Sequence, residues 1–295
     1  MQTRAYFYAF AAILLWSTIA SAFKFSLAHA GIFNLLFYSS STATIVLFSL
    51  IFFLGRKSEF KRINGKLLAR SAFRGILNPF LYYLVLLKAY DMLKAQEAGT
   101  LNYIWPIALV LLSIPLLKQK IGLTSIIAIL ISFTGILVIS TEGRISTLEF
   151  REPWGVLLAV GSSIFWALYW IFNMRDKHDE LLKLFLNFCF GTVFIFVAVL
   201  IFSSFEKPSL KGFVGAVYIG LFEMGITFFL WLKALKLSEN TARVANLVYL
   251  SPFLSLIIIR ITLGEKILWA TVGGLFLIVS GILLQEISRK EKRLS

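Results

Sequence analysis

The sequence predicts an all-α integral membrane protein whose ten transmembrane helices form two inverted five-helix repeats. Three observations lead to this prediction. The 295 residues are 59% hydrophobic and only 15% charged, whereas a soluble domain is about 25% charged. Ten separate apolar runs are each long enough to cross a bilayer. The two halves of the chain also resemble each other, with residues 1–145 and 146–295 as the two repeats of one integral unit.

Composition also argues against several other classes of protein. A chain with few charges and 29 phenylalanines cannot remain solvated and disordered. The net charge of +14 is typical of nucleic-acid binding, but the basic residues cluster between the apolar runs, so no nucleic-acid partner is expected. The single cysteine, Cys189, lies within an apolar run, and His29 is far in sequence from His178. We therefore expect no metal and no cofactor.

The apolar runs define the predicted helices. None shows the period-two alternation of a barrel strand, and a helix satisfies its own backbone hydrogen bonds in lipid. The first run follows Arg4 and contains Ala20-Ser21-Ala22, which resembles a signal cleavage site. It continues to about Ala28, which is long for a signal, so we expect it to be a retained helix. The ten runs are residues 5–28, 32–54, 67–90, 95–117, 121–141, 153–174, 181–203, 210–233, 240–261 and 267–286.

The distribution of Lys and Arg predicts the orientation. With the N-terminus in the cytoplasm, 20 of the 29 basic residues fall on the inner side and 8 on the outer side, and Lys24 falls within the first helix. Cytoplasmic loops carry such an excess. We therefore predict a multi-pass protein of the inner (plasma) membrane with both termini cytoplasmic.

The internal repeat has an odd number of helices in each copy. Pro106 and Gly135 are 29 residues apart, and so are Pro252 and Gly281. Five helices per copy mean that the second copy enters the membrane from the opposite side. Inverted repeats of this kind build secondary transporters, whose substrate site lies at the repeat interface near the midplane and which work by alternating access.

Polar and aromatic residues at depth in the helices are the candidates for a substrate site. Glu223 is the sharpest anomaly, because a carboxyl in mid-membrane must be protonated, paired or hydrated. It is the coupling candidate, and pairing with Lys24 is the structural alternative. Pro106 and Pro252 interrupt the fourth and ninth helices and are predicted hinges. The predicted substrate-binding residues are Trp16, Asn78, Tyr82, Asn102, Tyr103, Trp105, Trp166, Glu223 and Tyr249.

The fifth and tenth helices look structural. Small residues in both, including Gly135 in the fifth and Gly273, Gly274 and Gly281 in the tenth, would let two helix backbones approach closely. These helices therefore contribute no residue to the predicted site.

Motifs along nearly the whole chain resemble the drug/metabolite transporter superfamily, EamA type. They include Leu15-Trp16-Ser17, Trp166-Ala167-Leu168-Tyr169 and Leu263-Gly264-Glu265-Lys266. The segment from Glu97 to Pro106 is similar to the fourth helix of the aromatic amino-acid exporter branch. This resemblance implies ten helices around a central cavity and the export of amino acids or related metabolites. Glu223 stands where the family is expected to have a small residue.

These features predict a secondary or facilitative transporter for a small molecule and no enzyme. The sequence has neither a phosphate-binding loop for ATP nor a nucleophile with a base. The alternative is a proton-coupled multidrug exporter of lipophilic cations. Glu223 and the aromatic content favour it, whereas the lack of a mid-membrane carboxylate in the first helix argues against it. The sequence leaves the substrate, the coupling proton and the oligomeric state open.

Overall fold

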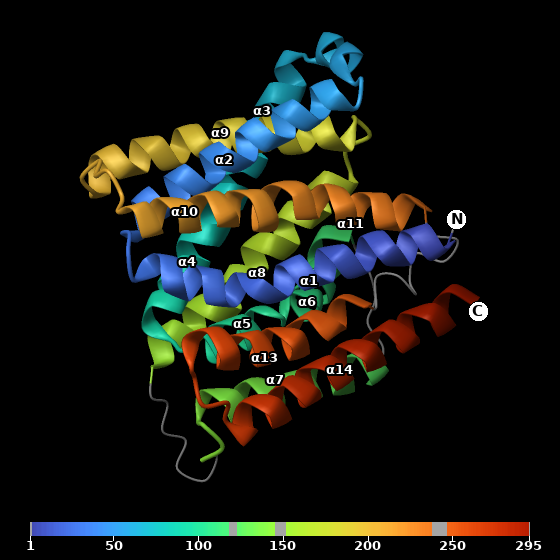
Figure 1. The fold of residues 1–295 in the computed structure, drawn as a ribbon. Coiled ribbons are helices and arrows are strands. Elements are labelled where there is room, and N and C mark those ends of the chain that lie inside the picture. Colours follow the sequence, from blue (N-terminus) through green and yellow to red (C-terminus); the bar gives the residue numbers. More distant parts are fainter. Residues whose placement is uncertain (1, 118–122, 145–151, 238–246, 295) are drawn as a thin grey trace.

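A computed structural model describes residues 2–117, 123–144, 152–237 and 247–294. Helices make up most of these segments and lie side by side in a bundle (Figure 1). The helices are α1 (Gln2–Leu27), α2 (Ile32–Phe53), α3 (Gly65–Gly75), α4 (Tyr82–Met92), α5 (Ala95–Asn102), α6 (Trp105–Leu117), α7 (Leu123–Ser140), α8 (Pro153–Met174), α9 (Glu180–Phe202), α10 (Leu210–Ile219), α11 (Ile226–Leu237), α13 (Ser251–Leu263) and α14 (Trp269–Leu294).

Several of the predicted helices are interrupted. A π-helical turn, η2 (Ile76–Leu81), joins α3 to α4, and a second one, η3 (Gly220–Gly225), joins α10 to α11. The fourth predicted helix is divided into α5 and α6. Five helical stretches are long and apolar enough to cross a membrane: Thr3–Leu27, Ile32–Phe53, Pro153–Asn173, Glu180–Phe202 and Leu210–Trp231. Shorter apolar helices cover Ile127–Ile139, Ser251–Leu263 and Trp269–Leu284.

Local sequence explains where several helices begin and end. The side-chain oxygens of Asn64, Asp179 and Ser209 accept hydrogen bonds from backbone N–H groups in the first turns of α3, α9 and α10. Such caps satisfy donors that have no partner within the helix. Gly264 ends α13 with a φ of 66°, a left-handed conformation that favours glycine.

Helices α2 and α9 lie against each other and run in opposite directions (Figure 1). The ring centroids of Phe37 and Phe196 are 5.5 Å apart, and those of Phe48 and Phe185 are 5.4 Å apart. As the residue number rises along α2, the number of the contacting residue on α9 falls, so the two helices are antiparallel. Aromatic pairs of this kind stabilise the contact beyond the area that they bury.

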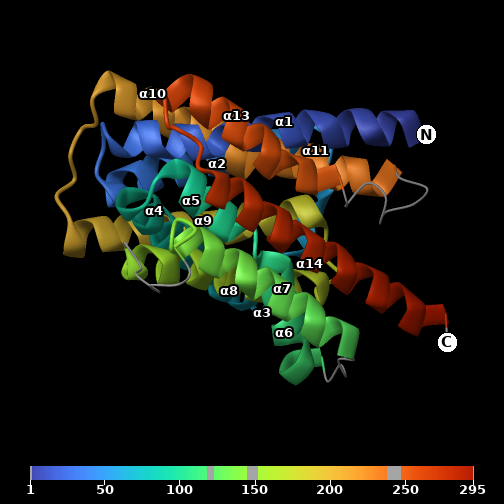
Figure 2. The same ribbon diagram turned by 90° about the horizontal axis from the view of Figure 1, so that it is seen from below.

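Helices α7 and α14 are also antiparallel neighbours (Figure 2). A Cβ added at Gly135 would lie 2.5 Å from the backbone oxygen of Gly274, and one added at Gly281 would lie 2.5 Å from that of Ala128. The predicted close approach is therefore confirmed for Gly135, Gly274 and Gly281. Gly273 has open space around it, so it takes no part in this contact.

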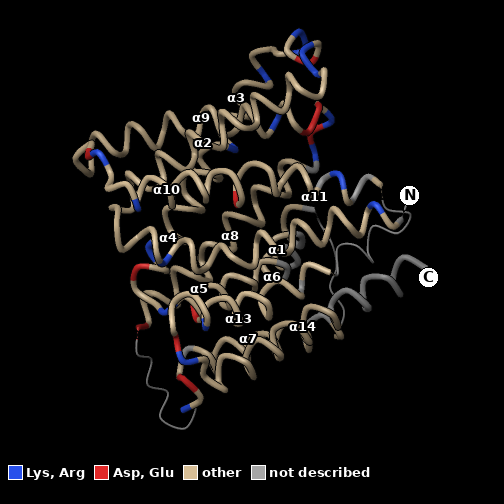
Figure 3. Tube along the Cα trace, viewed as in Figure 1, with Lys and Arg blue, Asp and Glu red and all other residues tan. Residues whose placement is uncertain are grey.

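Charged residues concentrate at the two ends of the helix bundle, and the region between the ends is mainly uncharged (Figure 3). The N- and C-termini lie at the same end (Figures 1 and 2). Lys24, which lies near the C-terminal end of α1, donates to the backbone oxygens of Tyr90 and Leu93, both at 2.7 Å. This lysine therefore satisfies carbonyl groups at the end of α4.

Candidate functional site

An aromatic cluster brings α1, α8 and α11 together in the middle of the bundle. The ring of Phe228 lies between two tryptophans, with its centroid 6.3 Å from Trp16 and 5.8 Å from Trp166. Trp231, one turn further along α11, lies 5.4 Å from Trp16. Trp16 and Trp166 are both half-buried. The structure thus brings the two predicted tryptophans into one cluster through a phenylalanine that joins them.

A polar chain continues from this cluster across α4, α5 and α8. The ring of Tyr82 lies 4.7 Å from that of Trp166, and its hydroxyl donates to Asn102 Oδ1 at 3.2 Å. Asn102 Nδ2 in turn donates to Ser162 Oγ at 2.9 Å. Three predicted residues therefore meet, and a serine on α8 completes the chain. A side-chain amide held in this way is pre-organised for hydrogen bonding.

Glu223 is buried in η3, with 8% of its surface exposed. The hydroxyl of Tyr83, which is fully buried on α4, donates to Glu223 Oε1 at 3.1 Å. No basic side chain among the described residues forms an ion pair with this carboxyl group. The alternative of pairing with Lys24 is wrong, because the Lys24 ammonium is held by backbone carbonyls at the end of α4.

Tyr103 joins the region from the turn between α5 and α6. Its side chain hydrogen-bonds to Ser251 at the start of α13. The Ser251 hydroxyl also lies 3.2 Å from the hydroxyl of Ser17, which is next to Trp16 on α1. Tyr103 is therefore connected to the α1 side of the aromatic cluster through two serines.

Two predicted residues are not joined to the cluster in the part of the chain that the structure describes. Asn78 is fully buried in η2, and neither its Oδ1 nor its Nδ2 has a hydrogen-bond partner among the described residues. Trp105 is half-buried at the start of α6, and no described ring packs against it. The side chain of Tyr249 lies outside the described residues.

The two predicted hinge prolines both stand at the beginning of a helix. Pro106 is the second residue of α6, and Pro252 is the second residue of α13. A proline in the first turn is well tolerated there, because that N–H has no partner within the helix. The interruption of the fourth helix therefore lies just before Pro106, at Tyr103 and Ile104.

Sequence reasoning did not include Phe228, Trp231 or Ser162 in the site. A signal for Phe228 was present, because the shift of 145 residues that places Lys88-Ala89 on Lys233-Ala234 also places Tyr83 on Phe228. The other two residues gave no such signal. An ordinary tryptophan or serine in an apolar helix carries no information on which way it faces.

A second polar cluster lies at one end of the bundle, in the loop between α8 and α9. Arg74 Nη2 donates to Asp176 Oδ2 at 2.6 Å, and the ring of His178 hydrogen-bonds to the other carboxylate oxygen. Burial raises the pKa of Asp176, but the hydrogen bonds from Arg74 and His178 outweigh it and hold the pKa well below its usual range. The ammonium of Lys183 donates to the backbone oxygen of Asp176 at 2.7 Å.

Comparison with known proteins places this geometry in context. The model of the EamA-like transporter family matches residues 3–141 and 153–285. A solved crystal structure of another protein superposes on the chain with a TM-score of 0.67 at 22% identity, covering 98% of this chain and 99% of that one. This likeness supports the fold.

Curated relatives are transporters. An uncharacterized transporter of Archaeoglobus fulgidus is 25% identical over 92% of this chain and 94% of its own length. An uncharacterized transporter of Acidianus ambivalens is 27% identical over 68% of this chain and 78% of its own length. The aromatic amino acid exporter YddG of Ancylobacter novellus is 24% identical over 85% of each chain.

Proposed function

The chain belongs to the EamA-like transporter family, and from this premise we propose that it exports amino acids or related small metabolites across the inner (plasma) membrane. Transport is secondary or facilitative and proceeds by alternating access between two inverted five-helix repeats, residues 1–145 and 146–295. The ten helices leave both termini in the cytoplasm. The position of the two termini at one end of the bundle supports this topology.

Symmetry between the two halves supports the inverted arrangement. Thr44 and Thr192 are 148 residues apart, and their hydroxyls are 3.2 Å from each other. The same shift of 148 residues places Phe37 on Phe185 and Phe48 on Phe196. It therefore maps the Phe37–Phe196 ring pair between α2 and α9 onto the Phe48–Phe185 pair. Both ring pairs have an interplanar angle of 41°. An exchange of this kind is typical of a two-fold axis, which would pass between the two threonines.

The observation that carries the substrate assignment is the buried carboxyl of Glu223, held by Tyr83 at the junction of the two halves. A carboxylate without a basic partner is suited to a substrate ammonium group or a coupling proton. The rings of Trp16, Trp166 and Tyr82 offer faces that favour cations and ring-bearing molecules. Asn102 can hydrogen-bond to a polar substrate group. An amino acid can offer a partner to each of these three features: an ammonium group, a ring-bearing side chain and a polar group.

Opening and closing of this site requires helices that can change their relative angle. The breaks at η2 and η3 occur at similar positions in the two halves, and the breaks before α6 and α13 lie next to Pro106 and Pro252. Interrupted helices are the usual place for substrate sites in carriers of this kind. We assign the two prolines as hinges. Among the predicted site residues, Asn78 in η2 would be free to bind substrate when the bundle opens.

Counterflow in proteoliposomes tests the proposal. Protein reconstituted with internal phenylalanine should take up labelled phenylalanine, and other amino acids should compete. In Glu223→Gln, apparent affinity should fall by about 10- to 150-fold, because a hydrogen bond to a charged group contributes about 1.5–3 kcal/mol. Glu206→Gln, which changes an exposed loop residue, is the matched control. Unchanged counterflow in Glu223→Gln would refute the substrate role.

The second candidate function is a proton-coupled exporter of lipophilic cations, which the absence of a described basic partner for Glu223 favours. In that case, lipophilic cations would compete and amino acids would not. A proton gradient would drive transport by the wild type but not by Glu223→Gln, while substrate-for-substrate exchange would persist. If neither class of compound competes, both assignments are wrong.

A further inference from the structure

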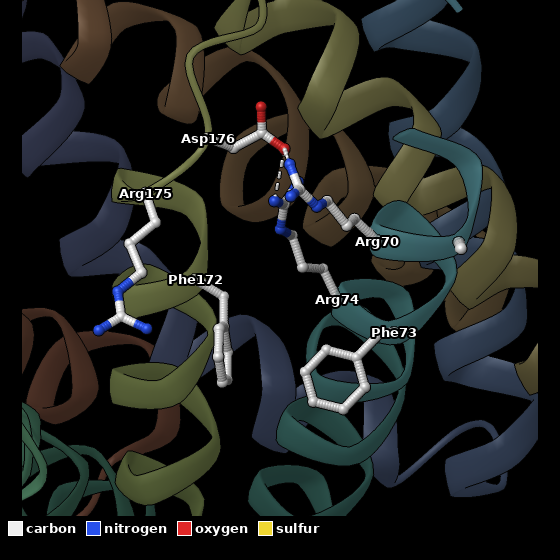
Figure 4. A pocket seen from close by; sticks show the side chains of 7 residues that line it. Arg70, Phe73, Arg74, Phe172, Arg175 and Asp176 are labelled. Carbon is white, nitrogen blue, oxygen red and sulfur yellow. Dashed lines mark hydrogen bonds and ion pairs between the residues drawn. The ribbon is translucent and has the colours of Figure 1, made fainter. Parts of the chain in front are cut away.

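A hollow of about 420 Å³ lies away from the aromatic cluster, where the second half of α3 faces the end of α8. Figure 4 shows the side chains around it. Arg70, Phe73 and Arg74 come from α3, whereas Phe172, Arg175 and Asp176 come from α8 and the loop after it. Its volume is within the range of pockets that bind small molecules.

The lining has more positive than negative charge. The guanidinium groups of Arg70 and Arg74 converge on one oxygen of Asp176, with Nη1 of Arg70 at 4.0 Å and Nη2 of Arg74 at 2.6 Å (Figure 4). Arg175 stands at the rim and donates from Nη2 to the backbone oxygen of Leu116 at 2.7 Å. Two guanidinium groups therefore face one carboxylate, and a third lies at the rim of the hollow.

Arg74 is an unsatisfied donor in this lining. The residue is only 3% exposed, and its Nη1 is buried without a hydrogen-bond partner among the described residues. A buried donor of a charged group without an acceptor is costly. Because a guanidinium group presents five N–H donors, Arg74 can keep Asp176 and still bind a second oxygen ligand. Arg70, whose side chain is 47% exposed, can reach the same ligand from the open side.

One wall of the hollow is apolar and continues along the outside of the bundle. The rings of Phe73 and Phe172 meet edge to face, with their centroids 5.3 Å apart, and Phe73 is 49% exposed. Ile76 lies one turn further along the same face, is 37% exposed, and leads toward the middle of the helices. A cationic end followed by an exposed apolar strip is complementary to a phospholipid, whose anionic phosphate is followed by apolar acyl chains.

We propose that this hollow binds a phosphate ester through Arg70 and Arg74, with Arg175 at its rim. The apolar wall favours an anionic phospholipid as the source of the phosphate, with an acyl chain along Phe73 and Ile76. Arginine is the residue of choice for phosphate, because its planar fork donates two parallel hydrogen bonds. The site is separate from the substrate site proposed above. Under the proposed topology, this site would lie in the cytoplasmic leaflet of the membrane. That leaflet is rich in anionic lipid.

The test uses the full chain purified in a neutral detergent and measures its thermal stability and its retained lipids by native mass spectrometry. Phosphatidylglycerol should raise the midpoint of thermal unfolding and remain bound, whereas phosphatidylcholine should do neither. Inorganic phosphate is compared with acetate at the same ionic strength. Arg70→Gln should weaken phosphatidylglycerol binding at least tenfold, whereas Lys61→Gln, which removes an exposed charge from the preceding turn η1 (Lys57–Arg62), should not.

Each outcome bears on the proposal. If phosphate protects as well as phosphatidylglycerol and acetate does not, the site is confirmed and its phosphate source is soluble. If phosphatidylglycerol acts no better than phosphatidylcholine and phosphate no better than acetate, the site does not exist. An equal loss in Lys61→Gln would reveal diffuse surface charge and would also overturn the proposal. The Arg70 variant is informative because it leaves the buried pair of Arg74 with Asp176 in place.

Discussion

Two adjacent glycines on α14 provide a sharp test of how α7 and α14 pack. A Cβ at Gly274 would lie 2.4 Å from Ile139 Cγ1 and 2.7 Å from the backbone oxygen of Gly135, whereas a Cβ at Gly273 would meet nothing within 4 Å. Both glycines are in the same helix, so Gly→Ala gives the same gain in helix propensity, about 1 kcal/mol. The difference between the two variants therefore isolates the contact between helices.

The expected magnitude follows from the geometry. Distances below 3 Å to backbone and to a branched side chain force the helices apart, and overpacking of this kind costs about 1–3 kcal/mol. Gly274→Ala should therefore be less stable than Gly273→Ala by about 1–3 kcal/mol. A shift of about 2–4 °C per kcal/mol is usual for domains of similar size. Thermal unfolding of the two variants in the same detergent measures the difference.

A reciprocal variant extends the test. Because a Cβ at Gly135 would lie 2.5 Å from the backbone oxygen of Gly274, Gly135→Ala should lower the unfolding midpoint about as much as Gly274→Ala. The two substitutions together should cost less than the sum of the single ones, since one separation of the helices relieves both clashes. Equal stability of Gly273→Ala and Gly274→Ala would refute the close packing of α7 against α14.

The remaining predictions concern the two polar clusters and the lysine on α1. Because the pKa of Asp176 is held below its usual value, its carboxylate stabilises the fold above a pH of about 4 and this contribution is lost as the pH falls through the lowered value. Asp176→Ala should lower the free energy of unfolding by about 3–5 kcal/mol near neutral pH. The variant should also lose less stability than the wild type as the pH falls below about 4, which thermal unfolding at several pH values measures. An unchanged dependence of stability on acid pH would contradict this. Lys24→Met removes two hydrogen bonds to carbonyl groups and should lower the unfolding midpoint without changing substrate affinity in counterflow. Ser162→Ala removes the partner of the Asn102 amide and should weaken substrate binding several-fold, whereas Ser163→Ala, whose hydroxyl bonds within its own helix, should not; identical affinities would exclude Asn102 from the site.

The segmentation of the chain could be predicted from the sequence because burial in lipid requires long apolar runs. The helices of the described residues fall within or close to the ten predicted runs, and the polar breaks between them coincide with caps such as Asn64 and Asp179. That Trp16 and Trp166 are both candidates for the site was also predictable, because the two residues align between the halves of the sequence. Glu223 stood out because a carboxyl group is rare in an apolar run.

Which side chains meet was decided only by the tertiary structure. An almost uniformly apolar helix has no polar face, so its sequence does not indicate which way each residue points. The hydrogen bond of Tyr83 with Glu223 joins residues 140 positions apart, and that of Arg74 with Asp176 joins residues 102 positions apart. Both depend on how far each helix is rotated and shifted against its neighbour. The sequence by itself therefore determined the helices and their depth, whereas the rotation and register of the packed helices determined the site, since these are fixed by contacts between distant segments.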